Sequence, residues 1–152
     1  FAENLSAEHG IDLLKRREQI DQHVVDRIEA GYEYDAVSYK QSNVARTTVF
    51  DALQSVFETH DLLITPTVAV PPVRADTGPP ESVDGHPLKR VHDLVLTWPV
   101  NLTGHPAASV PAGLVDGLPV GMQIIGPRFD DRAVIAAAAT IEDVRPWDGH
   151  YP

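Results

Sequence analysis

The sequence predicts an α/β fold in which helices cover a buried β-sheet. A short apolar segment at residues 62–67, stopped by a proline, follows a long stretch of helical character. In the stretch 93–126, short apolar runs alternate with Pro and Gly, and charged residues are nearly absent. Uninterrupted apolarity is typical of strands that are buried on both faces, as in a sheet covered by helices.

The first helical stretch covers residues 1–31. Ile20, Val24 and Ile28 recur at spacings of four, which places them on one face of a helix. Gly31 follows the last of them and is a suitable C-terminal stop.

Two further helices are expected on either side of the apolar stretches. Asp35 can cap a helix that runs to about His60, whose ring near the C-terminal end would interact favourably with the helix dipole. Asp130 or Asp131 can cap a last helix. Apolar residues recur in both helices at the spacing of one buried face. These are Val49, Phe50, Leu53, Val56 and Phe57 in the first of the two, and Val134, Ile135, Ala138 and Ile141 in the last.

A second and a third strand are expected at residues 107–110 and 119–125. Asp116-Gly117 between them is a strong hairpin pair, so these strands should be antiparallel neighbours. Three strands leave two apolar edges open, and such edges invite association. The sheet is therefore expected to be part of a larger one, completed by missing chain or by a second copy in a homodimer.

The segment 70–87 holds five prolines and two glycines, which argue against regular structure. It is predicted to be a Pro-rich surface loop, with a mobile rim over a site as the functional alternative. Residues 89–96 are a short helical candidate. Residues 98–104 are expected to form a turn in which Asn101 bonds to local backbone.

The composition of the chain argues against some classes of binding partner. The 152 residues, which favour one domain, carry a net charge of −10, and the only dense basic run, residues 15–17, is flanked by acids. These features argue against direct nucleic-acid binding and fit a solvated, acidic and salt-adapted surface. No apolar run is long enough to span a membrane, and the first residues do not resemble a signal peptide. The absence of Cys excludes thiol chemistry and makes a cytoplasmic location the default.

The residues alone give no complete catalytic constellation. No serine lies in a known nucleophile motif, and Ser109 is expected to be a satisfied core hydroxyl. No histidine pair has metal-ligand spacing, and no glycine cluster precedes a helix to hold phosphate, so neither a metal nor a cofactor is expected. Trp98, Asn101, Thr103 and His105 before the second strand are candidate pocket residues, and Asp93 just upstream is a further substrate-binding candidate.

Spaced motifs carry a family resemblance. N-L-T-G-H-P-A-A-S-V-P-A-G at 101–113 and G-L-P-V-G-M-Q-I-I-G at 117–126 resemble the C-terminal signature of the amidase signature family. The helix at 131–142 and Pro146-Trp147 are similar to that family's closing segment. Upstream, residues 39–67 with Arg46 and D-L-L-I-T-P-T resemble the helix and strand before the signature. The resemblance spans residues 20–147.

This resemblance implies the C-terminal part of a mixed, helix-covered sheet, which is incomplete as given. Family members cleave small-molecule carboxamides with a Ser-Ser-Lys triad carried by their N-terminal half. This sequence has no Gly-Ser-Ser segment, and Lys15, Lys40 and Lys89 match no triad position. The resemblance therefore implies no catalytic residue in this chain, which alone is expected to be inactive and to need the N-terminal half as partner.

Two alternatives remain open beside a general amidase. The family includes the amidase-type subunit of the amidotransferase that makes Gln-tRNA, in which an Asp before the T-x-P-x-N-L-x-G segment reads the substrate amide. Asp93 lies near that place, but its spacing to Asn101 is one residue longer, and I-E-A-G-Y-E-Y-D-A-V-S-Y is more similar to general amidases. Asp93 is then a structural residue. The second alternative is a non-catalytic module that binds a partner through the sheet edge.

Overall fold

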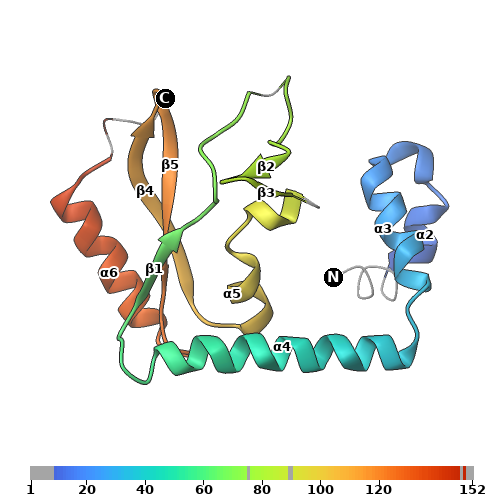
Figure 1. Ribbon diagram of the computed structural model, residues 1–152, viewed down its shortest axis with the longest axis horizontal. Coiled ribbons are helices and arrows are strands. Elements are labelled where there is room, and N and C mark those ends of the chain that lie inside the picture. The colour runs from blue at the N-terminus through green and yellow to red at the C-terminus, as the bar shows by residue number, and fades with distance from the viewer. Residues whose placement is uncertain (1–8, 75, 89–90, 148, 150–152) are drawn as a thin grey trace. The chain divides into compact units, whose positions relative to one another are not determined.

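A computed structural model describes residues 9–74, 76–88, 91–147 and 149 (Figure 1). The chain divides into two compact units, residues 1–45 and 46–152. The first unit contains α2 (Ile11–Leu14), the 3-10 helix η2 (Arg17–Gln19), α3 (Gln22–Tyr32) and the start of α4 (Ala36–Val56). The second unit contains the rest of α4 and the sheet.

The single helix predicted for residues 1–31 is wrong, because the helical stretch is interrupted before α3. Ile20 is extended, and the Asp21 carboxylate accepts a hydrogen bond from the backbone N–H of His23 at 2.8 Å, which starts a new helix. Val25 and Ile28 are fully buried. The buried face of α3 thus begins at Val25 and not at Val24, and the helix continues through Gly31.

The predicted cap of α4 is confirmed. The Asp35 carboxylate accepts a hydrogen bond from the backbone N–H of Ser38 at 2.7 Å. Hydrogen bonding to Ser38 holds the pKa of Asp35 below its usual range. The regular helix ends at Val56, and turns lead on to His60. The predicted apolar face is half-buried along its length.

The second unit is built on a three-stranded antiparallel sheet. Its strands are β1 (Leu63–Pro66), β4 (Ala107–Val115) and β5 (Leu118–Ile125), in the order β1-β5-β4. The predicted hairpin is confirmed: Asp116 and Gly117 have φ of 52° and 79°, as a tight hairpin turn requires. The α/β class is confirmed, and pairing among the described strands is antiparallel throughout.

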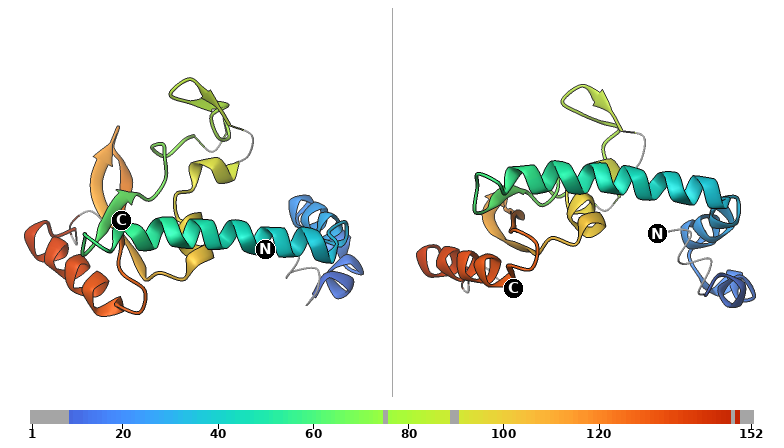
Figure 2. Two further views of the ribbon diagram at one scale, coloured as in Figure 1. Left: turned by 60° about the horizontal axis from the view of Figure 1, so that its bottom comes forward. Right: turned by 90° about the horizontal axis from the view of Figure 1, so that it is seen from below.

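The core of this unit lies between the sheet and α6 (Asp131–Val144). Asp130 caps α6 by accepting a hydrogen bond from the Ala133 backbone N–H at 3.2 Å. Figures 1 and 2 show α6 lying along one side of the β4–β5 hairpin. Val110, Ile124 and Val134 form the buried cluster. Ile135, predicted to be buried, is 66% exposed, because the packed face of α6 runs through Val134, Ala137, Ala138 and Ile141.

Two predictions between β1 and β4 are corrected. The segment 70–87 is not devoid of regular structure, since β2 (Ser82–Val83) and β3 (His86–Pro87) pair across an Asp84-Gly85 turn with positive φ at both residues. Residues 98–104 form helix α5 (Trp98–Thr103) and not a turn. Proline is tolerated in a first helical turn, and Gly104 in the left-handed conformation ends the helix.

The predicted helix at 89–96 is partly described. A 3-10 helix, η3, covers Val91–Leu94, and residues 89–90 lie outside the described part of the chain. None of the helices in the described ranges combines the length and the apolarity that crossing a bilayer requires.

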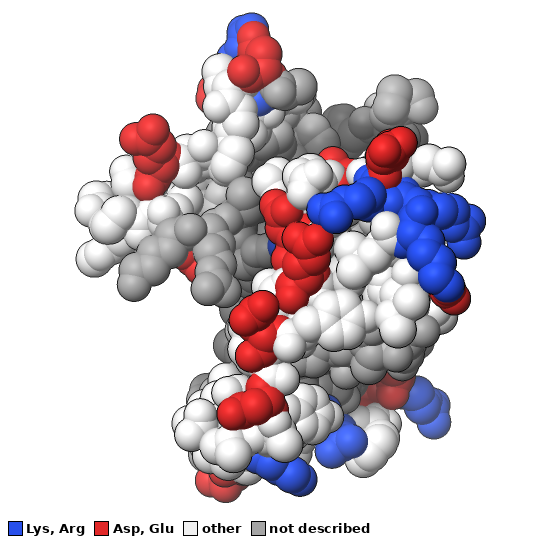
Figure 3. All heavy atoms as spheres, turned by 90° about the vertical axis from the view of Figure 1, so that its right-hand side faces the viewer, with Lys and Arg blue, Asp and Glu red and all other residues white. Residues whose placement is uncertain are grey.

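The basic run of the first unit is partly neutralised by its acidic neighbours. Lys15 Nζ lies 2.9 Å from an Asp12 carboxylate oxygen, and Arg17 Nη2 lies 3.1 Å from Glu29. In Figure 3 the largest group of Lys and Arg side chains has Asp and Glu side chains beside it, and further Lys and Arg side chains lie elsewhere on this face. A basic surface interleaved with acids is poorly suited to phosphate chains.

Candidate functional site

Thr103 and His105, two of the predicted pocket residues, lie together and are buried. The Thr103 hydroxyl donates to the Pro99 carbonyl at 3.0 Å, and Thr103 Oγ1 lies 2.9 Å from His105 Nδ1. Because the Thr103 proton is used on the carbonyl, Thr103 accepts from His105, which places the ring hydrogen on Nδ1. Among the described residues, His105 Nε2 has no hydrogen-bond partner.

The surroundings of His105 favour its neutral form. The rings of Phe50 and Phe57 each have their centroids 5.4 Å from that of His105. Burial and, to a smaller extent, the charge of Arg128 hold the pKa of His105 below its ordinary value. His105 therefore acts as a neutral packing partner that joins α4 to the start of β4.

The other three predicted residues lie around α5 and η3. Trp98 is half-buried in the first turn of α5, while Asn101 and Asp93 are exposed. The Asn101 backbone N–H makes a helix bond to Thr97 O. Arg46 Nε donates to the Leu102 carbonyl, which ties α4 to the end of α5. None of the five predicted residues lines the groove described next.

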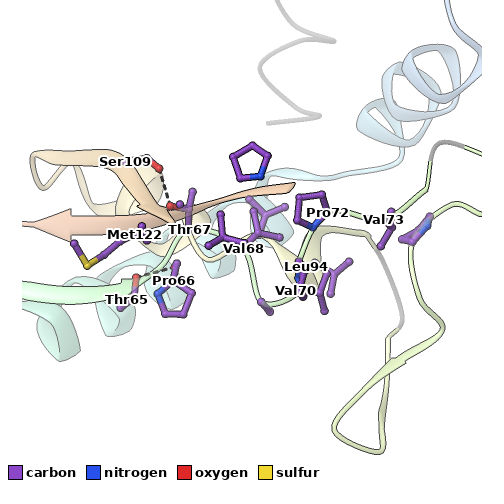
Figure 4. Close-up of a pocket in the computed structure, with 18 of the residues that line it drawn as sticks. Thr65, Pro66, Thr67, Val68, Val70, Pro72, Val73, Leu94, Ser109 and Met122 are labelled. Carbon is purple, nitrogen blue, oxygen red and sulfur yellow. Dashed lines mark hydrogen bonds between the residues drawn. The ribbon is translucent and has the colours of Figure 1, made fainter. Parts of the chain in front are cut away.

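An open groove of about 1040 Å³ lies in the second unit, where β1 continues into the Pro-rich segment (Figure 4). The continuation is held by strand-like pairing: Ala69 N–H donates to Leu94 O at 2.8 Å, and Leu96 N–H donates to Thr67 O at 3.2 Å. The wall is mostly apolar. It includes Val68, Val70, Pro72, Leu94, Val95 and Met122.

Polar side chains share the sheet face opposite α6. Thr67 Oγ1 and Ser109 Oγ lie 2.7 Å apart. Gln123 Nε2 donates to Thr65 Oγ1 at 3.0 Å and to Leu96 O at 3.3 Å. Successive strand residues face opposite sides, and the register pairs Thr65 and Ser109 with Gln123, so these side chains meet on one face.

Ser109 is not the core hydroxyl that was predicted. It is exposed at the groove, although its hydroxyl is hydrogen-bonded to Thr67. A Cβ added at Gly121 would come within 2.8 Å of Thr67 Oγ1 and 2.9 Å of Ser109 Oγ, so glycine leaves room for the pair. The sequence does contain a signal for a polar sheet face. Thr65 and Thr67 are polar residues two positions apart, which is the spacing that places side chains on the same face of a strand.

Arg74 is the one charged side chain among the described residues that line the groove. Its Nε and Nη2 donate to the two carboxylate oxygens of Asp76 at 2.9 and 2.8 Å. This pairing lowers the pKa of Asp76 and leaves little net charge at the rim.

A family model for amidases matches residues 4–135. The chain belongs to the amidase signature family. Members of this family are hydrolases that act on amides, and the family resemblance seen in the sequence is confirmed.

Relatives come from two branches of the amidase signature family. The amidase-type subunit of glutamyl-tRNA(Gln) amidotransferase from Geobacillus thermodenitrificans is 39% identical over 125 residues, which cover 82% of this chain and 24% of that protein. The same subunit from Streptococcus pyogenes serotype M49 is 37% identical over the same shares. The chain thus spans about a quarter of the length of these curated relatives.

Solved structures match the amidase fold over nearly the whole chain. A bacterial aryl acylamidase superposes with a TM-score of 0.83 and 34% identity, covering 99% of this chain and 34% of that one. The amidase-type subunit of the amidotransferase from Thermotoga maritima superposes with a TM-score of 0.59 and 28% identity, covering 90% of this chain and 28% of that one. Both branches share the fold described above.

Proposed function

We propose that this chain is the C-terminal part of a cytoplasmic amidase that hydrolyses carboxamides to an acid and ammonia or an amine. The observation that carries the proposal is the family match over residues 4–135, which includes the β4–β5 hairpin that bears the signature motifs. The superposition on an aryl acylamidase supports a general amidase.

The chemistry is assigned to a Ser-Ser-Lys triad outside residues 1–152. The serine oxygen attacks the amide carbon, the amine leaves with a proton relayed from that serine, and water then releases the acid from the acyl-enzyme. The described chain supplies sheet strands and one wall of the acyl pocket. The N-terminal half of the same protein is its proposed partner.

The residues around α5 have supporting roles in this proposal. Trp98 and Asn101 border the substrate pocket from α5. Thr103 at the end of α5 and His105 just after it anchor the helix in the core, which their burial supports. Asp93 is structural, as its position in η3 suggests.

A second candidate is the amidase-type subunit of a Glu-tRNA(Gln) amidotransferase. The observation that favours it is the 36–39% identity to that subunit in several bacteria. The higher TM-score with the aryl acylamidase, 0.83 against 0.59, weighs for the general amidase.

The test is an activity assay on the full-length protein that contains this chain. Ammonia release from a panel of small amides is expected, and glutamine-dependent amidation of Glu-tRNA(Gln) is not. The gene upstream should encode a Gly/Ser-rich stretch and a matching Lys. Absence of both would refute the amidase proposal, and tRNA amidation would select the second candidate.

A separate measurement addresses the non-catalytic sheet-edge module. Residues 1–152 are expressed alone and studied by size-exclusion chromatography and thermal melting. The amidase proposal predicts aggregation or self-association, including a homodimer, that adding the N-terminal half relieves. A cooperative, monomeric melt would instead favour an independent module.

A further inference from the structure

The hydroxyls of Thr67 and Ser109 form an accessible, hydrogen-bonded polar pair on the wall of a largely apolar groove. Figure 4 shows the two side chains pointing toward each other, with Val68, Val70, Pro72 and Leu94 to one side. The two oxygens lie 2.7 Å apart, and Ser109 is exposed. Within the part of the chain that the structure describes, the pair is therefore open to a ligand in the groove.

Hydrogen counting shows what such a pair can bind. Two hydroxyls carry two hydrogens, and one of them is used in the bond between Thr67 and Ser109. One O–H remains free to donate, and lone pairs on the oxygens remain free to accept. This pattern complements a neutral group that both accepts and donates, such as a hydroxyl.

The other residues of the groove wall determine which charge and polarity a ligand can have. The other described lining side chains are overwhelmingly aliphatic, and the guanidinium of Arg74 is occupied by Asp76. A free ammonium or carboxylate would find no unpaired opposite charge among these lining residues and would lose its hydration. An uncharged, apolar body fits this wall.

We infer that Thr67 and Ser109 form a specificity subsite for a neutral hydroxyl on the apolar part of an uncharged carboxamide. This inference rests on the amidase function proposed above and adds a substrate class to it. The scissile amide itself lies elsewhere, at the triad. Gly121 is required because any side chain there would occupy the position of the hydroxyl pair.

The probes are phenylacetamide and its ortho-, meta- and para-hydroxyphenyl analogues, given to the full-length protein. At least one hydroxylated isomer is expected to have a KM about five- to ten-fold lower than phenylacetamide, as one extra hydrogen bond allows. Thr67→Val and Ser109→Ala should each remove that preference. Gly121→Ala should also remove it.

Matched controls separate the subsite from general effects of mutation. Ser55→Ala and Thr140→Val delete hydroxyls that bond only to helix carbonyls, at Ala52 and Ala136, so both should keep the preference. Thermal melts check that each variant is folded, and binding of phenol measured by calorimetry gives a readout without turnover.

The outcomes separate the two proposals. Hydrolysis of none of the four amides, with no activity on the wider amide panel, contradicts the amidase function. Hydrolysis without preference for any hydroxylated isomer overturns the subsite alone. A preference that survives in both Thr67→Val and Ser109→Ala also overturns it.

Discussion

The two faces of the β1-β5-β4 sheet use the same strands in opposite ways. One face packs Val110 and Ile124 against Val134 of α6. The other face carries Thr65, Thr67, Ser109 and Gln123, joined by hydrogen bonds. The comparison shows that strands with a largely apolar sequence can still separate an apolar packing face from a polar face by alternation alone.

The largest effect is expected from removing packing on the closed face. Ile124 is fully buried, so Ile124→Ala should lower the free energy of unfolding by about 2–5 kcal/mol through lost burial and a residual cavity. Denaturant unfolding measures the loss. Ile135→Ala is the control, because Ile135 is 66% exposed and its truncation should change stability by less than about 0.5 kcal/mol. Equal effects would contradict the assignment of the α6 face.

On the opposite face, a buried polar residue should contribute to stability through its hydrogen bonds. Gln123 is 2% exposed and donates to Thr65 and Leu96. Gln123→Ala should cost about 1–3 kcal/mol, since both acceptors are left without this donor. Denaturant unfolding with Gln54→Ala on the exposed side of α4 as control checks this. A neutral Gln123→Ala would show that this face does not depend on its hydrogen bonds.

The hairpin turn decides which residues lie on which face, because a one-residue slip would exchange them. Gly117 has φ of 79°, so Gly117→Ala should cost about 1 kcal/mol through backbone strain. Gly117→Asn, which tolerates this conformation better, should cost less. The measurement is again unfolding by denaturant. A larger loss for Asn than for Ala would argue against the turn geometry.

The smallest effect concerns the buried imidazole beside α5. The pKa of His105 is lowered in the folded state, so its contribution to stability is complete above the ordinary histidine value of about 6.5 and is lost as the pH falls through the folded value. Stability measured from pH 7.5 to pH 5 should therefore fall less steeply in His105→Leu than in the unmodified protein. A steeper slope in His105→Leu would contradict the neutral assignment.

Features set by neighbouring residues were predictable from the sequence. The caps at Asp35 and Asp130 and the Asp116-Gly117 turn each depend on a few adjacent residues, and all three are confirmed. The motif strings predicted the family for the same reason, since they are local and specific.

Some features were missed although they are local. The Asp21 cap of α3 and the Asp84-Gly85 turn between β2 and β3 each involve residues close in sequence, but the prediction followed the apolar periodicity and the prolines of those segments instead. The exposure of Ser109 could not be predicted from an apolar run, because it depends on strand register and on where α6 packs. The five predicted pocket residues are grouped in sequence. The structure buries Thr103 and His105 together, and none of the five lines the groove.

The pairing of residues 67–69 with residues 94–96 closes the base of the Pro-rich segment. A loop that is clamped at its base can change in length at little cost, about 0.6 kcal/mol for each doubling of its residues. Insertions and deletions between these anchors would therefore reshape the rim of the groove while β1 and α5 keep their positions. Because both ends are held by this pairing, the segment between them can change in length and sequence while the sheet stays unchanged.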